Sequence, residues 1–303
     1  MSIEICIICG SSDTSVFVHL HSNNLIALKC KNCSHIYVNN SPINADNISE
    51  YYTMEDFKGK RTLQEFEYSN YYSDCFVDYN QRNESSLVLM QFKEKANYFD
   101  SLLPKGSKIL DVGCATGVFL DMMRKFEWEV EGVEVSNELA SYAHEKFDIQ
   151  VHVQDLTKEK LDSGPFQVIT MFDVIEHIPD PNLMIKACSD LLVENGLLLL
   201  RTPTEEALLR DIAKGLYLTT LKKIDFPMLW FYSYEHLHSF STNSLKNLLV
   251  NHGFEVTKVF REEESLDRLN ISPILNFFLS FVNIISSWTN KQHKISLVAK
   301  KIY

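Results

Sequence analysis

From Lys108 onward the chain alternates between short apolar runs and longer amphipathic stretches. The apolar runs predict strands at 108–112, 129–135, 149–153, 166–172 and 196–201. The stretches between them repeat apolar positions at helical intervals and predict helices at 117–127, 137–146 and 181–193. Nearly continuous apolar strands that alternate with helices are typical of a parallel sheet covered on both faces, so the pattern predicts an α/β domain.

Two further patterns precede this region. Apolar positions at helical spacing predict a helix from Glu84 to Leu103, and Pro104 to Gly106 then form a turn. Residues 41–84 are rich in Asn, Ser and Tyr and form a connecting or cap segment. Their tyrosines could stack on a ligand, but half-buried packing is the more common role of such a cluster: Tyr51, Tyr52, Tyr68, Tyr71, Tyr72 and Tyr79.

The N-terminus carries four cysteines in two pairs. Each pair has the Cys-x-x-Cys spacing, with 20 residues between the pairs: Cys6, Cys9, Cys30 and Cys33. This spacing predicts a closed, structural zinc site, because two such turns complete a tetrahedron of thiolates. Between the pairs, residues 16–20 alternate in polarity and residues 25–28 can return as a second strand. We therefore expect a small zinc ribbon over residues 1–40, too small to fold without the metal.

Composition narrows the class of protein. The chain has 303 residues, 45% of them hydrophobic, and a formal net charge of −11, which excludes collagen-like and wholly disordered chains. Residues 1–50 carry two lysines against four acidic residues and offer no footprint for nucleic acid. The start of the chain lacks the pattern of a secretory signal, so we expect the seven cysteines to be reduced and the protein to be cytoplasmic.

A glycine-containing loop follows the first predicted strand. Gly113 and Gly117 permit a tight turn close to a ligand, and Glu134, 21 residues after Gly113, can accept hydrogen bonds from a ribose diol. Asp155 follows the third strand and can accept a hydrogen bond from an adenine amino group. Asp111 precedes the loop, where a carboxylate repels pyrophosphate but suits a ligand with ammonium and sulfonium charges. The loop is not Gly-x-Gly-x-x-Gly, and no Gly-Lys-Ser/Thr is present, which argues against nicotinamide and nucleotide-hydrolase sites.

At these residues the sequence resembles class I S-adenosylmethionine (SAM)-dependent methyltransferases. The matching blocks are 109–120, 130–136, 166–181, 195–203 and 238–256. The resemblance implies a Rossmann-like sheet of seven strands in the order 3-2-1-4-5-7-6, with strand six near 254–261 and an antiparallel strand seven near 294–301. It also implies a set of SAM-binding residues: Asp111, Gly113, Cys114, Gly117, Glu134, Asp155, Phe172 and Asp173.

With its four cysteines, the chain resembles a zinc-containing branch whose members often methylate sugars or other small metabolites. One departure is Ala115, where the family usually has a second glycine. Because alanine adds only a methyl group, we expect SAM binding to survive with slightly altered backbone angles.

Candidates for acceptor chemistry follow the fourth strand and recur near residue 236. Glu176, His177, His236 and His238 are the candidate catalytic residues, with His177 as a general base. Two alternatives remain for His177. It could brace the following loop, or it could bind a divalent cation with Asp173 and Glu176, as a loose similarity to ubiquinone-pathway O-methyltransferases suggests.

Two insertions complete the expected methyltransferase domain of residues 85–303. We expect residues 205–234, which contain an aromatic cluster, to form a lid over the acceptor. Such a cluster more often packs in the protein than contacts a substrate. Residues 262–292 contain an uncharged stretch, 269–290, with a polar stripe at Asn276, Ser280, Asn283 and Ser287. The stripe and Pro273 argue against a membrane span. We expect a helix packed on the lid or on a partner subunit of a homodimer, with an interfacial membrane helix over 274–288 as the alternative.

The sequence thus predicts a methyltransferase that uses SAM on a small-molecule acceptor, a sugar or related metabolite, with structural zinc. Two rivals remain open. One is an rRNA methyltransferase with a zinc module, which the acidic N-terminus disfavours. The other is a SAM-binding scaffold protein without turnover, which would release no S-adenosylhomocysteine (SAH).

Overall fold

The computed structural model describes residues 5–44, 46–47, 62–63, 66–67, 86–266 and 272–302. The tyrosines of the predicted connecting segment lie outside these residues. Within that segment the structure describes one short antiparallel pair, β4 (Thr62–Leu63) with β5 (Phe66–Glu67).

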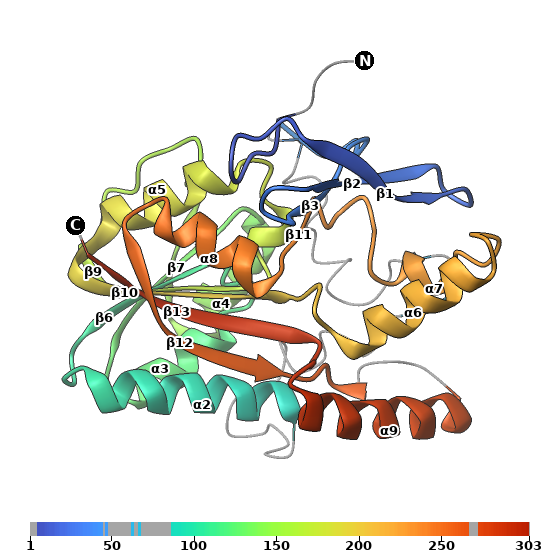
Figure 1. The fold of residues 1–303 in the computed structure, drawn as a ribbon. Helices are drawn as coiled ribbons and strands as arrows, with labels where there is room; N and C mark the ends of the chain where they lie inside the picture. The colour runs from blue at the N-terminus through green and yellow to red at the C-terminus, as the bar shows by residue number, and fades with distance from the viewer. Residues whose placement is uncertain are drawn as a thin grey trace.

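A seven-stranded sheet forms the centre of the molecule (Figure 1). Its strands are β6 (Lys108–Val112), β7 (Glu129–Glu134), β8 (Gln150–Val153), β9 (Phe166–Phe172), β10 (Leu192–Pro203), β12 (Phe254–Glu262) and β13 (Lys294–Lys301). They lie in the order β12-β13-β10-β9-β6-β7-β8, and β13 runs antiparallel to both its neighbours. In order of appearance along the chain this is 3-2-1-4-5-7-6, which confirms the predicted topology. The carboxyl ends of the parallel strands therefore meet at one edge, where ligands of such sheets bind.

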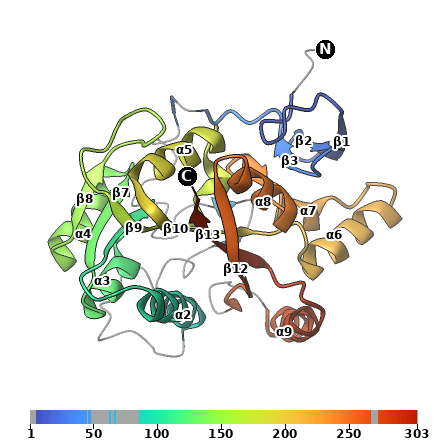
Figure 2. The same ribbon diagram turned by 60° about the vertical axis from the view of Figure 1, so that its left-hand side comes forward.

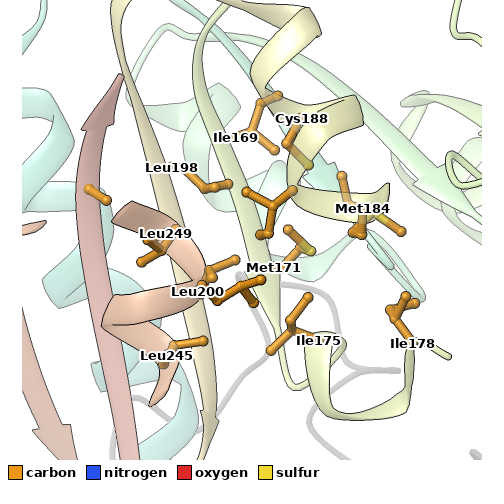
Figure 3. Close-up of a cluster of buried hydrophobic side chains, with 14 of the residues drawn as sticks. Ile169, Met171, Ile175, Ile178, Met184, Cys188, Leu198, Leu200, Leu245 and Leu249 are labelled. Atoms are coloured by element: carbon orange, nitrogen blue, oxygen red, sulfur yellow. The ribbon is translucent and has the colours of Figure 1, made fainter. Parts of the chain in front are cut away.

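Helices cover both faces of this sheet. They are α2 (Leu87–Leu102), α3 (Val118–Lys125), α4 (Asn137–Phe147), α5 (Pro181–Leu191) and α8 (Thr242–Val250). Strand β10 shows why both faces are apolar. Leu198 and Leu200 point toward α5 and α8 (Figure 3). Leu197 and Leu199, on the other face, pack with residues of α2 and α3. Successive side chains of a strand point to opposite faces, so a leucine run buries both.

A second, four-stranded sheet lies beside the first. It has the order β1 (Thr14–Leu20), β2 (Leu25–Cys30), β3 (Ile36–Val38) and β11 (His238–Ser239). The hairpin of β1 and β2 is the one that the sequence predicts. The strands β3 and β11 were not predicted, because runs of three and two residues are too short to show a period. Their antiparallel pairing joins the N-terminal region to the segment between α7 (Phe226–Leu229) and α8.

The insertion after β10 packs on this second sheet. It contains α6 (Leu208–Thr219) and α7 (Phe226–Leu229). Ala213, Tyr217 and Tyr232 share a buried core with Val18 and Leu25 of the hairpin. The Tyr217 hydroxyl also donates to the backbone oxygen of His19 over 3.0 Å. The aromatic residues of the insertion therefore serve as packing for the N-terminal sheet, as the sequence favoured.

The helix predicted over 269–290 is α9 (Pro273–Thr289). It begins at Pro273 with Ser272 as its N-cap and ends at Asn290 in a left-handed conformation. Among the residues that the structure describes, no helix is long and apolar enough to cross a membrane.

Candidate active site

The loop after β6 has the backbone of a ligand-binding turn. Gly113 and Gly117 have φ angles of 71° and 77°, in the left-handed region that glycine adopts without strain. A Cβ on Gly113 would lie 2.5 Å from Cγ2 of Val174, so a larger residue cannot fit there. Ala115 also has a positive φ, of 49°. It therefore keeps the glycine-like conformation that the resemblance requires, at the cost of backbone strain.

Two buried carboxylates flank this loop. Asp111 accepts a hydrogen bond from Thr170 Oγ1 over 2.7 Å, and burial raises the pKa of Asp111 to about 7, with the nearby charge of Glu134 adding to the shift. Glu134 accepts from the backbone nitrogens of Ala115 and Ser136, each over 2.9 Å. Burial raises the pKa of Glu134 although these amides oppose the shift. A site with two such carboxylates favours a cationic ligand, whose charge offsets their repulsion.

The remaining predicted cofactor residues take different positions around the loop. Phe172 packs against the rings of Phe92 and Phe119, with centroid distances of 4.8 and 4.7 Å. Asp155 follows β8 and accepts from the backbone nitrogen and hydroxyl of Thr157 through Oδ1. The thiol of Cys114 is buried in the core. A buried thiol cannot contact a ligand, so Cys114 could contribute to a ligand site only through its backbone.

Asp173 belongs to a buried cluster of charged side chains that the sequence pattern does not predict. Its Oδ2 lies 2.6 Å from Arg201 Nη2 and 2.9 Å from Lys294 Nζ. Burial raises the pKa of Asp173, but these two cations outweigh burial and hold it below its usual range. Lys294 also bonds Glu264 over 2.8 Å. Asp173 therefore stays ionised and is held at the end of β9 by residues from β10 and β13.

Glu176, His177 and His236 come together from two distant segments. Glu176 and His177 lie in a short 3-10 helix, η4 (Ile175–His177), directly after β9. Ligand atoms of the three side chains lie within 4.8 Å of one another. His177 Nδ1 is 2.8 Å from the backbone oxygen of Glu235 and so donates to it, which leaves Nε2 as the nitrogen with a lone pair. Burial lowers the pKa of both histidines, so both rings are neutral near pH 7.

Glu176 differs from Asp173 in forming no ion pair with any of the described residues, although the nearby charge of Lys294 partly opposes the rise of its pKa. Both of its carboxylate oxygens are buried and lack a hydrogen-bond partner within the described part of the chain. Burial, with the neighbouring charge of Asp173, raises the pKa of Glu176 to about 8. At neutral pH this carboxyl group is protonated unless a cation binds it.

His238 is not one of the three residues whose ligand atoms converge, although it bonds the backbone at Ile178, directly after His177. Its Nδ1 is 3.0 Å from Nε2 of His35, and it belongs to the strand that joins the N-terminal sheet. Burial lowers its pKa to about 4. The geometry thus places His238 at the contact with the N-terminal region, and His236 beside His177.

The four predicted zinc ligands converge. All four sulfur atoms lie within 4.8 Å of one another, with 3.6 Å between Cys6 and Cys33 and 3.5 Å between Cys9 and Cys30. A tetrahedral zinc–thiolate site with bonds of about 2.3 Å requires sulfur atoms about 3.8 Å apart. The cysteine set therefore fits zinc. Burial raises the pKa of Cys6 to about 11, so a cation is needed to keep its thiolate ionised.

Two comparisons bear on what this arrangement does. The family model described as "Methyltransferase domain" matches residues 87–259, which is more than half of the chain. Curated relatives named ubiquinone biosynthesis O-methyltransferase match over a shorter stretch. One from Xanthomonas axonopodis pv. citri is 34% identical over 119 residues, and one from Coxiella burnetii is 34% identical over 103 residues. These matches cover 35% and 32% of this chain and 49% and 44% of the relatives, so the chain spans about half the length of the curated relatives it matches.

Solved structures share the fold. Magnesium protoporphyrin IX methyltransferase from Synechocystis PCC 6803 with bound SAH has a TM-score of 0.55 and 16% sequence identity. The comparison covers 85% of this chain and 100% of that one. A putative sarcosine dimethylglycine methyltransferase from Galdieria sulphuraria has a TM-score of 0.51 at 14% identity and covers 73% of this chain and 87% of that one.

Proposed function

The chain belongs to the methyltransferase-domain family, and from this premise we propose that it transfers the methyl group of SAM to a hydroxyl group of a small molecule. The observation that carries the acceptor side is the position of His177 beside Glu176 and His236, at the carboxyl end of β9. Relatives named as O-methyltransferases support an oxygen acceptor. They give no support to the sugar that the sequence resemblance suggested, so the proposal specifies a hydroxyl compound.

The proposed cofactor site is the loop after β6 with Asp111 and Glu134. The ammonium and sulfonium charges of SAM would complement the two buried carboxylates, and Glu134 would accept from the ribose hydroxyls in addition to its two backbone amides. Gly113 and Gly117 would let the backbone of the loop turn tightly beside the ligand. Their own nitrogens donate to the carbonyl oxygens of Val133 and Cys114 and hold this turn in place. The family resemblance supplies Asp155 and Phe172 as the partners of the adenine end, and that assignment is part of the proposal.

Methyl transfer itself is an in-line displacement. The acceptor oxygen forms a bond to the methyl carbon while the sulfur–carbon bond breaks, and the neutral thioether SAH leaves. The hydroxyl proton passes to Nε2 of His177, whose Nδ1–H is fixed on the Glu235 carbonyl. His177 is suited to this role because its lowered pKa keeps the ring neutral and ready to accept a proton. The protein contributes mainly alignment of the two reactants and this base.

A second candidate role for the same residues is a divalent cation site. Glu176, His177 and His236 supply an oxygen and two nitrogens at mutual distances that suit one ion. The buried oxygens of Glu176 have no hydrogen-bond partner among the described residues. A bound cation would lower the pKa of a coordinated hydroxyl group. Asp173, which the sequence analysis grouped with these ligands, is instead bonded to Arg201 and Lys294.

We also propose that Cys6, Cys9, Cys30 and Cys33 hold a structural zinc ion. Four thiolates fill a tetrahedral site and leave no position for a substrate. Two of the cysteines, Cys30 and Cys33, lie at the end of β2 and in the turn before β3. Strand β3 pairs with β11, which follows His236 in the chain. Zinc would therefore act on the reaction only through the position of this strand.

Two assays test the proposal together. Wild-type protein with SAM and a panel of hydroxyl compounds should release SAH, and His177→Ala should lose that release while binding SAM normally. If neither protein released SAH above background although both bound SAM, the non-catalytic scaffold would replace the enzyme. RNA belongs in the acceptor panel, because methylation of RNA alone would replace the small-molecule proposal.

A further inference from the structure

Helix α9 presents three faces of different chemistry. Leu279, Val282 and Ser286 are buried against the rest of the chain. The predicted polar stripe forms a second face: Asn276, Ser280, Asn283 and Ser287. The third face is apolar and exposed to solvent, with exposed fractions from 46% for Phe278 to 86% for Trp288: Ile274, Phe277, Phe278, Phe281, Ile284 and Trp288. Figure 2 views α9 almost along its axis at the periphery of the molecule, where its outer side faces away from the labelled elements.

The spacing of the exposed face matches a helix partner. The residues at 274, 277, 281, 284 and 288 are separated by alternating steps of three and four. These are the a and d positions of a heptad, which place side chains in a straight seam along one side of a helix. A second helix fills such a seam by inserting its own side chains between them.

The area of this face is also that of a dimer interface. Four aromatic rings and two isoleucines at these exposures present on the order of 800 Å² of apolar surface, because a full aromatic side chain carries about 150–250 Å². This exceeds the largest apolar patch of a typical monomer, about 300–600 Å². It equals the roughly 800 Å² that each partner buries in a standard protein interface.

The charge pattern selects the partner. Residues 273–289 contain no charged side chain, so two copies of α9 meet without repulsion. A helix that lies on a membrane carries lysine or arginine on its polar face, and the polar face of α9 has only asparagine and serine. The net charge of −11 would further oppose an anionic lipid surface.

We propose that two copies of this chain form a symmetric dimer in which the exposed seam of α9 packs against the same seam of the second copy. One surface patch then serves both partners, as a two-fold axis requires. Phe281 lies at the centre of the seam, and Ile274 and Trp288 lie near its two ends.

Light scattering of the full-length protein after gel filtration tests this. The wild type should have twice the chain mass of 35.0 kDa. Phe281→Glu should weaken the dimer at least about 30-fold, since a charge in the centre of an apolar interface costs 2 kcal/mol or more, and should elute as a monomer. The matched control is Leu183→Glu, because Leu183 on α5 is 48% exposed but lies away from α9; this variant should remain a dimer.

Two controls keep the test decisive. Both variants should keep the wild-type circular dichroism spectrum and SAM affinity, which separates loss of the dimer from loss of the fold or of the proposed function. In addition, Trp288 emission should shift to shorter wavelength on dimerisation, and Trp288→Phe should remove the shift. A wild-type monomer, a Phe281→Glu dimer, or monomers that cosediment with phosphatidylcholine–phosphatidylglycerol vesicles would each overturn the proposal.

Discussion

The ring of His177 is fixed by the loop that leads into the N-terminal sheet: its Nδ1 lies 2.8 Å from the backbone oxygen of Glu235. This contact joins the end of β9 to a segment 58 residues away and determines which ring nitrogen can accept a proton. The proposed base is therefore oriented by the chain between the insertion after β10 and strand β11.

Replacement of His177 tests its catalytic role. His177→Ala should lower kcat by about 10²- to 10⁴-fold, because it removes the proton acceptor. The SAM dissociation constant should stay near the wild-type value. Steady-state kinetics and calorimetry measure the two quantities, with His21→Ala, at an exposed histidine between β1 and β2, as the control. A near-normal kcat in His177→Ala would move the search for the base to His236.

The pH profile provides a second test of the same residue. Burial lowers the pKa of His177, so the ring loses its proton below the ordinary imidazole value of about 6.5. The kcat should be constant from neutral pH upward and should fall as pH drops through this lowered pKa. If the cation role is correct instead, chelator should abolish the activity and Mg²⁺ should restore it in protein that retains its cysteine-bound zinc.

Asp111 makes cofactor binding depend on pH. Its pKa of about 7 means that the carboxyl group loses its proton as pH rises from 6 to 8, and the negative charge then attracts the sulfonium group of SAM. SAM affinity should rise over this range. SAH carries no sulfonium charge, so its affinity should change less. Calorimetry at several pH values measures both ligands, and equal slopes for SAM and SAH would contradict this role.

Glu134 connects two loops of the cofactor pocket through its bonds to Ala115 and Ser136. Glu134→Ala removes these bonds as well as the proposed ribose acceptor. SAM affinity should fall by about 10- to 100-fold, the value of one or two hydrogen bonds to a charged group. Asp162→Ala, at an acidic residue outside the predicted site, is the control. Unchanged affinity in Glu134→Ala would remove Glu134 from the site.

The zinc proposal predicts a selective defect. Wild-type protein purified without chelator should contain one zinc per chain, and Cys30→Ser should lose it. Because β3 then no longer holds β11, hydrogen exchange should increase at His238 and Ser239, and turnover should fall. SAM affinity should persist, since the loop after β6 makes none of these contacts. Absence of zinc in the wild type would refute the assignment.

The sequence predicted the parts of this structure that have a local signal. The strands β6 to β10 show as apolar runs, the cysteine pairs have metal-site spacing, and the glycines mark a turn that needs positive φ. The remaining features depend on pairings between distant residues. Asp173 meets Lys294 from 121 residues away, and His35 meets His238 from 203 residues away. No hydrophobic period and no sequence motif predicts such contacts, because each partner alone is an ordinary polar residue.

The orientation of helix α9 could not be predicted from the sequence either. The sequence predicts a polar stripe on this helix and apolar residues on its other sides. Which apolar residues are buried depends on where the helix docks: Leu279 and Val282 face the chain, whereas Phe277 and Phe281 face solvent. Helical periodicity gives the relative angles of side chains but not the orientation of the helix on its neighbours.

We propose above all that the site formed by Asp111, Glu134 and the loop after β6 binds SAM. The most direct measurement is calorimetric titration of the full-length protein with SAM, SAH and NADH. We predict that one molecule of SAM or SAH binds per chain, that NADH gives no binding heat, and that SAM at 100 times its dissociation constant stabilises the fold by about 2.7 kcal/mol. Binding of NADH without binding of SAM or SAH would contradict the account.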